Sequence, residues 1–480
     1  MALAVMALRA PVLALARIFA AGGVLAVGRV FAVARIFAVA RVLAVRRVLA
    51  LGWALAFAGM LVLPARAGGG APANVQVVRM WTLLSGGDGA RMRALVDGFN
   101  ASQREVRVES TTLKWGEPFY TKLITAGVVG EGPDVATIHL SRLPNLAGGG
   151  VLRPITPAEL DAAGLAGTDF LPRQWDRSQY GNGTYAIPLD IHPLVLYYNK
   201  TLVGQAGLLD GQGRLKPIVG MAALTAAFRA VKERTGKDGL AMEAAQSTYA
   251  IWRLWLSLLA QQGLQVVDKN RFAYGPAGEH TLAAIAHWFQ AGYATPGLNY
   301  PASTSQFMAG NAGFMLNGAW EVPELVRGTR DGTLGFRYGI VPLPALYGNA
   351  SAWADSHGFA VPANTGRPLT PARMQAVLRF VAYVSRHSLG WAEGGHIPAY
   401  RPVAESAALR TLMPNAEYAG AAPNVVYDPP GWYMGAAGPV EAIASKFLPA
   451  PLSGQLTPAD ALRRFETEAQ RLVDKRPPQY

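Results

Sequence analysis

The sequence predicts an α/β protein of two lobes, each a mostly parallel β-sheet flanked by helices. From residue 74 onward, alternating apolar stretches that suit strands are interleaved with stretches of helical spacing. Hydrophobic residues make up 51% of the 480 residues and charged residues 16%, which is enough apolar surface for a sizeable core. No internal repeat with a period of about 20 to 50 residues is visible, which argues against solenoids and propellers.

The first strands and helices alternate strictly. Strands are expected over residues 74–81, 104–111 and 133–140, and helices over 90–102 and 118–132. This β-α-β-α-β order predicts a mostly parallel sheet with helices on both faces, because parallel strands need crossover connections.

The later elements are longer and more widely spaced. A strand ends at Pro188, a short polar segment follows, and the apolar run 194–199 begins a new strand. A helical region with loop breaks is expected from about 218 to 290. The remaining expected elements are strands over 334–344 and 356–363 and helices over 439–448 and 457–475, the last with Thr457 as N-cap and Pro458 as first residue.

Charge is concentrated at the N-terminus. The formal net charge is +13, but residues 1–73 contain eight arginines and no acidic residue, so the rest has 36 basic and 31 acidic residues, a net charge of +5. Without a basic stripe downstream, we expect no nucleic-acid partner. The chain has no cysteine, which excludes disulfides, thiolate zinc sites and a cysteine nucleophile.

The N-terminal region divides into two segments. Residues 1–45 are a low-complexity Arg/Ala/Val segment, interpreted as not translated or, alternatively, as a membrane anchor laced with arginine. Residues 46–67 have the basic start, apolar middle and small-residue cleavage site of a signal peptide. We therefore expect a periplasmic or extracellular protein, and the absence of cysteine predicts that it is not a lipoprotein.

Motifs for common enzyme classes are missing. The sequence contains no Walker A loop, G-x-S-x-G elbow or H-E-x-x-H motif. The seven histidines do not fall at metal-ligand spacing, so neither a metal nor a cofactor is expected. A glycoside hydrolase needs paired carboxylates, and Asp134, Asp190, Glu321 and Asp355 leave that alternative open.

The stretch "FMAGNAGFMLNGAW", Phe307 to Trp320, resembles a motif of the extracellular solute-binding proteins of ABC sugar importers, family 1, which includes maltose- and trehalose-binding proteins. Further matching stretches follow the same order, among them "GTYAIPLDIHPLVLYYNK", "SHGFAVPA" and "GHIPAYRPV". The resemblance covers about residues 75–475. It implies the type II periplasmic-binding-protein fold, with solute held in a cleft between two lobes.

Mapped onto this chain, the resemblance implies discontinuous lobes. Lobe 1 would consist of residues 74–188 and 345–400, and lobe 2 of 189–344 and 401–480. The stretches "PLDIHP" and "VPLP" would be the hinge crossings, where proline limits how the chain bends.

A sugar presents C–H groups on its faces and hydroxyls around its edge, so its site needs aromatic platforms and polar partners. Trp252 and Trp255, three residues apart on an apolar helix, are expected in the core instead. The ligand-binding residues we expect are Trp81, Asp134, Asp190, His192, Trp320, Glu321, Trp353, His357, Trp391, Arg401, Trp432 and Tyr433.

The resemblance implies a monomeric, non-catalytic protein that captures a di- or oligosaccharide and delivers it to ABC transporter permease subunits. Two alternatives remain open. One is a protein that binds glycerol phosphate or another polyol, although only Arg401 is placed near the cleft as a basic residue. The other is a secreted glycoside hydrolase, which activity on aryl glycosides would reveal.

Overall fold

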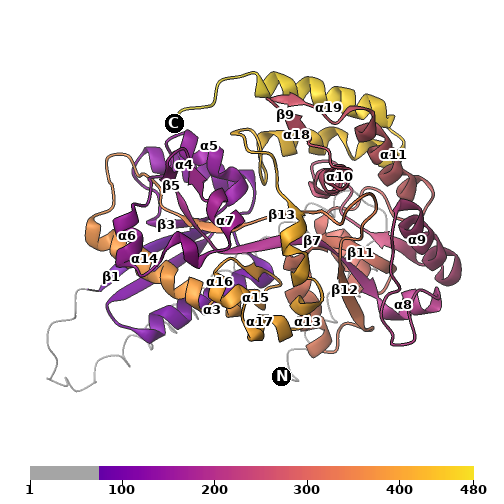
Figure 1. The fold of residues 1–480 in the computed structure, drawn as a ribbon, viewed down its shortest axis with the longest axis horizontal. Coiled ribbons are helices and arrows are strands. Elements are labelled where there is room, and N and C mark those ends of the chain that lie inside the picture. Colours follow the sequence, from indigo (N-terminus) through magenta and orange to yellow (C-terminus); the bar gives the residue numbers. More distant parts are fainter. Residues whose placement is uncertain (1–74) are drawn as a thin grey trace, which may run out of the picture. The chain divides into compact units, whose positions relative to one another are not determined.

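Two β-sheets organise the computed structural model of the protein, which describes residues 75–480 (Figure 1). The segments 1–45 and 46–67 lie outside the described residues. The first sheet contains β1 (Gln76–Thr82), β2 (Val106–Thr112), β3 (Val135–His139), β6 (Ala186–Pro188) and β14 (His357–Ala360). The second contains β7 (Asp190–Asn199), β8 (Asp238–Ala241), β11 (Ala312–Gly318), β12 (Tyr338–Pro342), β13 (Ala352–Asp355), β15 (Ile397–Pro398) and β16 (Val425–Val426).

The first sheet and its helices form what we call the first lobe. Its strand order is β2-β1-β3-β14-β6, in which β1 pairs in parallel with β2 and β3, and β14 runs antiparallel to β3 and β6. Figure 1 shows helix α14, in orange, among the indigo elements of this lobe. Phe99, Phe380 and Tyr383 pack edge to face within its core. The helices of this lobe include α3 (Gly86–Ser102), α4 (Glu117–Val128), α5 (Leu143–Gly148), α6 (Pro157–Ala162), α7 (Pro172–Arg177) and α14 (Pro371–Arg386).

The second sheet, with its helices, forms the second lobe and is built around β7. This strand pairs antiparallel with β11, β12, β13 and β15, and all of its residues are buried. Because side chains alternate along a strand, Leu194 and Leu196 belong to one apolar core and Val195 and Tyr197 to another. Both faces of the sheet are therefore covered.

The second lobe carries most of the long helices. The helices of this lobe include α8 (Lys200–Gln205), α9 (Met221–Thr235), α10 (Ala250–Gln261), α11 (Gly275–Gln290), α12 (Tyr300–Met308), α13 (Val322–Arg330), α18 (Pro439–Phe447) and α19 (Pro458–Val473). The start predicted for the last helix is confirmed, because the Thr457 side chain accepts a hydrogen bond from the Asp460 backbone and Pro458 follows at once. The chain also contains three short helices, α15 (Leu389–Ala392), α16 (Arg401–Ala404) and α17 (Ala407–Thr411). Two pairs of short strands lie apart from the two large sheets, namely β4 (Gln179–Tyr180) with β5 (Gly183–Thr184) and β9 (Val267–Asp268) with β10 (Arg271–Phe272).

The chain passes between the sheets at three places. Leu189 separates β6 from β7, Ser356 separates β13 from β14, and the segment after α15 returns to pair with β7 through β15. The predicted crossing at Val341–Pro344 is wrong, because β12 and β13 both belong to the second sheet and the passage occurs only after Asp355. We propose that the chain otherwise divides into its lobes at the predicted boundaries.

Two further expectations differ from the structure. The α/β class is as predicted, but the sheets are mixed rather than mostly parallel, since strands that enter from the other sheet run against their neighbours. Residues Asp238–Ala241, expected within a helical region, form β8 because they pair with β11. Among the described residues, no helix is both long and apolar enough to span a bilayer.

Candidate functional site

Trp320 lies just beyond the buried strand β11, at the start of the segment that leads into α13. Its indole nitrogen donates a 3.0 Å hydrogen bond to the Tyr300 hydroxyl, which in turn donates to the Glu321 carboxylate. A Cβ added at Gly318 would lie 2.0 Å from the Trp320 ring, so the ring requires a glycine beneath it. The half-buried indole is thus held in one orientation with part of its surface accessible.

Arg253 lies among four aromatic side chains. Its guanidinium carbon is 4.5 Å from the ring centre of Trp353, 5.7 Å from Tyr249, 5.8 Å from Trp320 and 5.9 Å from Trp115. Trp115 precedes α4 of the first lobe, whereas the other rings belong to the second lobe. We call Trp115, Tyr249, Trp320 and Trp353 the aromatic wall, and it is built from both lobes.

The charge of Arg253 is balanced inside the protein. Its Nε donates a 2.9 Å hydrogen bond to the buried Glu441 carboxylate. Burial raises the pKa of Glu441 to about 7 and Arg253 opposes that rise. Burial likewise raises the pKa of Glu321 to about 7, although the Tyr300 hydrogen bond lowers it. The site therefore holds two carboxyl groups that ionise near neutral pH.

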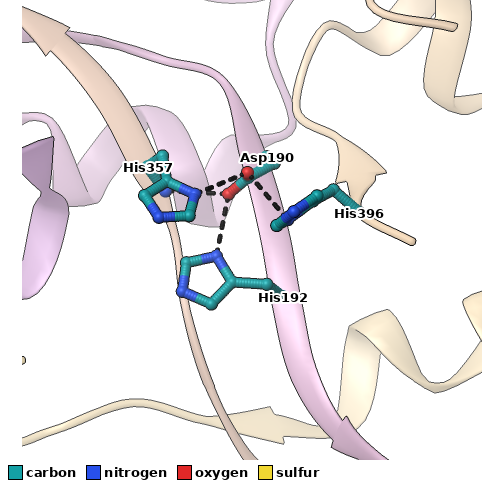
Figure 2. Close-up of side chains that lie close together, drawn as sticks. All are labelled: Asp190, His192, His357 and His396. Carbon is teal, nitrogen blue, oxygen red and sulfur yellow. Dashed lines mark hydrogen bonds and ion pairs between the residues drawn. The ribbon is translucent and has the colours of Figure 1, made fainter. Parts of the chain in front are cut away.

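Asp190, the first residue of β7, is the centre of a buried polar cluster (Figure 2). Its carboxylate lies 3.0 Å from His192 Nδ1 and 2.8 Å from His357 Nδ1. It also accepts hydrogen bonds from the Trp391 indole at 2.7 Å and from the His357 backbone at 2.7 Å. Figure 2 shows that the second ring nitrogens of His192 and His357 point away from Asp190.

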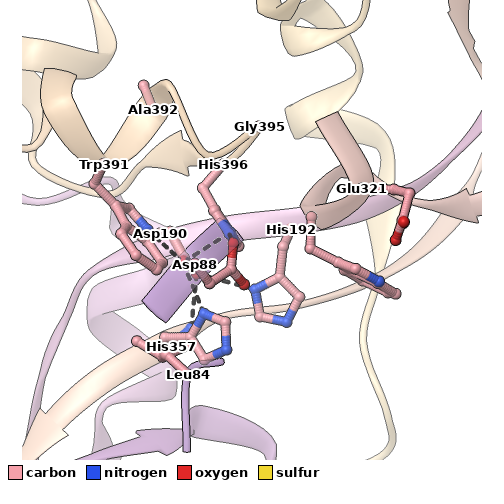
Figure 3. A network of polar contacts seen from close by, with 12 residues as sticks. Leu84, Asp88, Asp190, His192, Glu321, His357, Trp391, Ala392, Gly395 and His396 are labelled. Carbon is pink, nitrogen blue, oxygen red and sulfur yellow. Dashed lines mark hydrogen bonds and ion pairs between the residues drawn. The ribbon is translucent and has the colours of Figure 1, made fainter. Parts of the chain in front are cut away.

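His396 joins this cluster from the third crossing between the sheets (Figure 3). Its Nδ1 lies 3.1 Å from Asp190 Oδ2, its Nε2 lies 2.9 Å from Asp88 Oδ1, and its ring stacks on Trp391. Burial opposes protonation of His396, but Asp88 and Asp190 outweigh it and raise the pKa to about 10. Burial is the main cause that lowers the pKa of His192 to about 3. For Asp190, His357, His396 and His192 outweigh burial and hold the pKa well below its usual value.

A second polar group connects the lobes beside this cluster. His139, at the end of β3, lies with its Nδ1 2.8 Å from the Tyr120 hydroxyl. The Ser141 hydroxyl donates to the Asp355 carboxylate, whose pKa is raised to about 6, mainly by burial. The neighbouring Arg142 donates to the backbone carbonyl of Ala437 in the second lobe at 2.9 Å.

Many of the predicted ligand residues come together at this junction. They are Asp190, His192, Trp320, Glu321, Trp353, His357 and Trp391. The rings of Trp353 and Trp391 are fully buried, and each donates its indole N–H to an internal carboxylate, Asp428 and Asp190 respectively. Trp320 is only half-buried, so it offers ring surface that those two do not.

The other predicted ligand residues have different surroundings. Asp134 accepts hydrogen bonds from Arg373 and from the Arg79 backbone, and Trp81 lies 5.1 Å from the Lys122 ammonium. The Tyr433 hydroxyl donates to Asn270, and Trp432 packs edge to face on the Tyr433 ring.

Arg401 is exposed and lines a separate surface hollow beside Phe170 and Trp175. It was the one basic residue that we placed at the cleft from sequence. Sequence reasoning overlooked Arg253, the basic residue that lies among the four rings of the aromatic wall.

Sequence reasoning also missed Trp115, Tyr249, Tyr300 and His396. A signal for Arg253 existed, because a lone arginine in the otherwise apolar stretch "AIWRLWLSLLAQ" is costly to bury without a partner. His396 had no such signal. His192, His357 and His396 come from segments far apart in the chain, so their spacing in sequence carried no information.

The comparison with protein families is decisive. The family described as "bacterial extracellular solute-binding protein" matches residues 94–447 of this chain, which is more than half of its length. The chain is a member of this family. The family resemblance predicted from the stretch between Phe307 and Trp320 is thereby confirmed for this solute-binding protein.

Solved structures share the fold of this solute-binding protein. The GacH receptor of Streptomyces glaucescens, solved without ligand and with acarbose, is 23% identical, with a TM-score of 0.70 over 84% of this chain and 100% of that one. UgpB of Mycobacterium tuberculosis, in complex with glycerophosphocholine, is 19% identical, with a TM-score of 0.71 over 85% of this chain and 99% of that one. At these identities the likeness establishes the two-lobed fold.

One curated relative corrects the expected localisation. An uncharacterized lipoprotein of Streptomyces antibioticus is 27% identical over 323 residues, 65% of this chain and 64% of the relative. The prediction that the solute-binding protein is not a lipoprotein is wrong by this comparison. The prediction rested only on the absence of cysteine from this chain.

Proposed function

We propose that the solute-binding protein captures a carbohydrate, a di- or oligosaccharide, and delivers it to the permease subunits of an ABC transporter. The observation that carries this proposal is the aromatic wall around Arg253, to which both lobes contribute. Trp115, Tyr249 and Trp320 are only partly buried, so their faces can pack against the C–H faces of a sugar ring, while Trp353 backs Arg253 from the core. The guanidinium and carboxyl groups can pair with the sugar hydroxyls. GacH, which was solved with acarbose, supports the same class of solute.

Polar groups are available for hydroxyls beside the wall. Arg253 donates a hydrogen bond to Glu441 through Nε alone. The two terminal nitrogens of the Arg253 guanidinium make no hydrogen bond to the protein within residues 75–480. Glu321 lies next to Trp320 with one carboxylate oxygen engaged by Tyr300. Charged hydrogen bonds of this kind are stronger than neutral ones, and they are directional, which favours a solute with defined hydroxyl positions.

Glycerophosphocholine, the ligand of UgpB, is the second candidate because UgpB has the same fold. A quaternary ammonium group would favour an aromatic cage. In this chain, however, the Arg253 guanidinium already occupies the space among the rings. The nearby buried carboxyl groups of Glu441 and Asp428 also disfavour a phosphate. A neutral, hydroxyl-rich solute fits this wall better.

A thermal-shift screen tests the proposal, because a ligand that binds only the native state raises the melting temperature. The panel should contain maltose, longer malto-oligosaccharides, acarbose, glycerol 3-phosphate and glycerophosphocholine. We expect at least one saccharide to raise the melting temperature and the two phosphates to leave it unchanged. A shift with glycerophosphocholine alone would replace the carbohydrate proposal, and hydrolysis of an aryl glycoside would point to an enzyme.

A further inference from the structure

The buried cluster around Asp190 contains three histidines beside one carboxylate, and all four side chains are of types that bind metal ions. Asp190, His192, His357 and His396 each present one ligand atom, and these atoms all lie within 4.8 Å of one another. Each of the four residues is at most 4% exposed. We propose that this cluster is a binding site for a divalent transition-metal ion, with Zn²⁺ as the ion that suits it best.

The orientation of His396 is the independent observation behind the proposal. Its Nδ1 is buried and has no hydrogen-bond partner among the described residues, although it lies 3.1 Å from Asp190 Oδ2. Its other nitrogen faces the Asp88 carboxylate at 2.9 Å. Metal-bound histidines usually donate their second ring N–H to a carboxylate in this way, which fixes the ring and strengthens the ligand. His396 is therefore positioned as a ligand with its supporting carboxylate in place.

The other ligands are held equally firmly. His192, on the same strand as Asp190, and His357, the first residue of β14, point their Nδ1 atoms at the Asp190 carboxylate, to which the Trp391 indole also donates a hydrogen bond. The nitrogen–oxygen distances are 2.8 to 3.1 Å. Tetrahedral Zn²⁺ with bonds of about 2.0–2.2 Å separates its ligand atoms by about 3.4 Å. The side chains need to part by roughly half an ångström to admit the ion.

The donor set selects the type of ion. Three imidazoles and one carboxylate suit Zn²⁺ and its neighbours, whereas Ca²⁺ and Mg²⁺ prefer oxygen ligands alone. Two carboxylates, Asp190 and Asp88, face His396, so the cluster favours positive charge. Because all four ligands are supplied by protein, the site has the closed form of structural zinc rather than the open form of catalytic zinc.

The location gives the ion a role. Asp190 follows the first passage between the sheets, His357 follows the second, and His396 lies on the third. An ion here would tie together all three connections between the lobes. This goes beyond the proposed capture of carbohydrate, and it can be tested without knowledge of the solute.

Calorimetric titration of Zn²⁺ into chelator-treated, dialysed protein tests the site. We expect one equivalent to bind and the melting temperature to rise. The matched control changes the three exposed histidines together, His280→Gln, His287→Gln and His387→Gln, and should keep that equivalent. His396→Gln should lose it, and Asp88→Asn should weaken Zn²⁺ binding by about 10- to 100-fold.

Two results would overturn the proposal. One is the absence of a stoichiometric Zn²⁺ equivalent in the unaltered protein, and the other is its loss in the variant without exposed histidines. Should His396→Gln fail to fold, Co²⁺ added to the unaltered protein and to the exposed-histidine variant decides the matter. Both should show the visible absorption bands of four-coordinate Co²⁺, and their absence in either one would refute the buried site.

Discussion

Trp320 and Glu321 are neighbours in the chain, yet they are joined through a third residue, because the Tyr300 hydroxyl accepts from the Trp320 indole and donates to the Glu321 carboxylate. This arrangement fixes the plane of the indole and the position of the carboxylate together. A solute that meets both groups finds them already oriented, so little side-chain freedom is lost on binding.

Replacement of Trp320 tests whether its ring is a binding platform. We expect Trp320→Ala to weaken binding of the saccharide identified by the thermal-shift screen by about 5- to 150-fold, which corresponds to roughly 1–3 kcal/mol for the loss of one large apolar contact. The stability of the unliganded protein should change less than in Trp252→Ala, since Trp252 is fully buried and its truncation should cost about 3–5 kcal/mol. Titration calorimetry and urea denaturation of both variants make the comparison. Normal binding by a Trp320→Ala protein that unfolds early would show that Trp320 is a core residue.

Glu321 should make stability depend on pH in a direction opposite to most carboxylates. Its pKa is about 7 in the folded protein and near 4.5 when exposed, so between these values the folded state binds the additional proton. Stability from this group is therefore fully present below about pH 4.5 and is lost as pH rises to about 7. The loss is roughly 3 kcal/mol at most, at about 1.4 kcal/mol for each pH unit.

The variant Glu321→Gln isolates this contribution, because it keeps an acceptor for Tyr300 and removes the titration. We expect the unaltered protein to lose more stability than the variant between pH 5 and pH 8, measured by urea denaturation. Parallel pH profiles for the two proteins would contradict the assignment. Glu441 shifts in the same direction, but it titrates in both proteins and cancels in the difference.

The buried pair of Arg253 and Glu441 should show strong coupling. Glu441→Leu leaves the guanidinium of Arg253, a residue only 8% exposed, without its partner, and should destabilise the protein by about 3–5 kcal/mol. The double variant Arg253→Met with Glu441→Leu should recover much of that stability, because two apolar side chains replace two charges. Equilibrium denaturation of the single and double variants completes a mutant cycle. Additive losses would mean that the pair does not act as a unit.

The three passages between the sheets predict a hinge. We expect the lobes to close on the solute by rotation about the segments around Leu189 and Ser356. Small-angle X-ray scattering should then give a smaller radius of gyration with saturating saccharide than without it. An unchanged radius for a protein that binds the saccharide in calorimetry would argue against hinge closure.

The sequence predicted those features that depend on local pattern. The apolar run before Trp320 forms β11, and Thr457 caps α19, because strand alternation and capping involve residues close together in the chain. The two-lobed fold followed from the family motif. Pairing direction was harder to foresee, because β6 and β14 enter the first sheet from connections to the second.

The polar groups at the junction were only partly predictable. Asp190 and His192 were selected because they flank the expected hinge, and His357 because it lies at the start of an apolar strand, but their common contact depends on how two distant segments meet. His396 was missed for the same reason. Arg253 lies on a helix whose tryptophans marked it as core, and that assignment was correct for Trp252 and Trp255 while it concealed the charged residue between them.

The position of β14 has a consequence for biosynthesis. In the first sheet this strand lies between β3 and β6, although it is made more than 160 residues after β6 ends. A growing chain that has delivered only β1, β2, β3 and β6 to the ribosome exit lacks the strand that joins β6 to β3. Domains normally fold as units, the N-terminal one first, but here the N-terminal lobe must wait for residues near 360. We therefore expect the first sheet to remain incomplete until residues near 360 have been made.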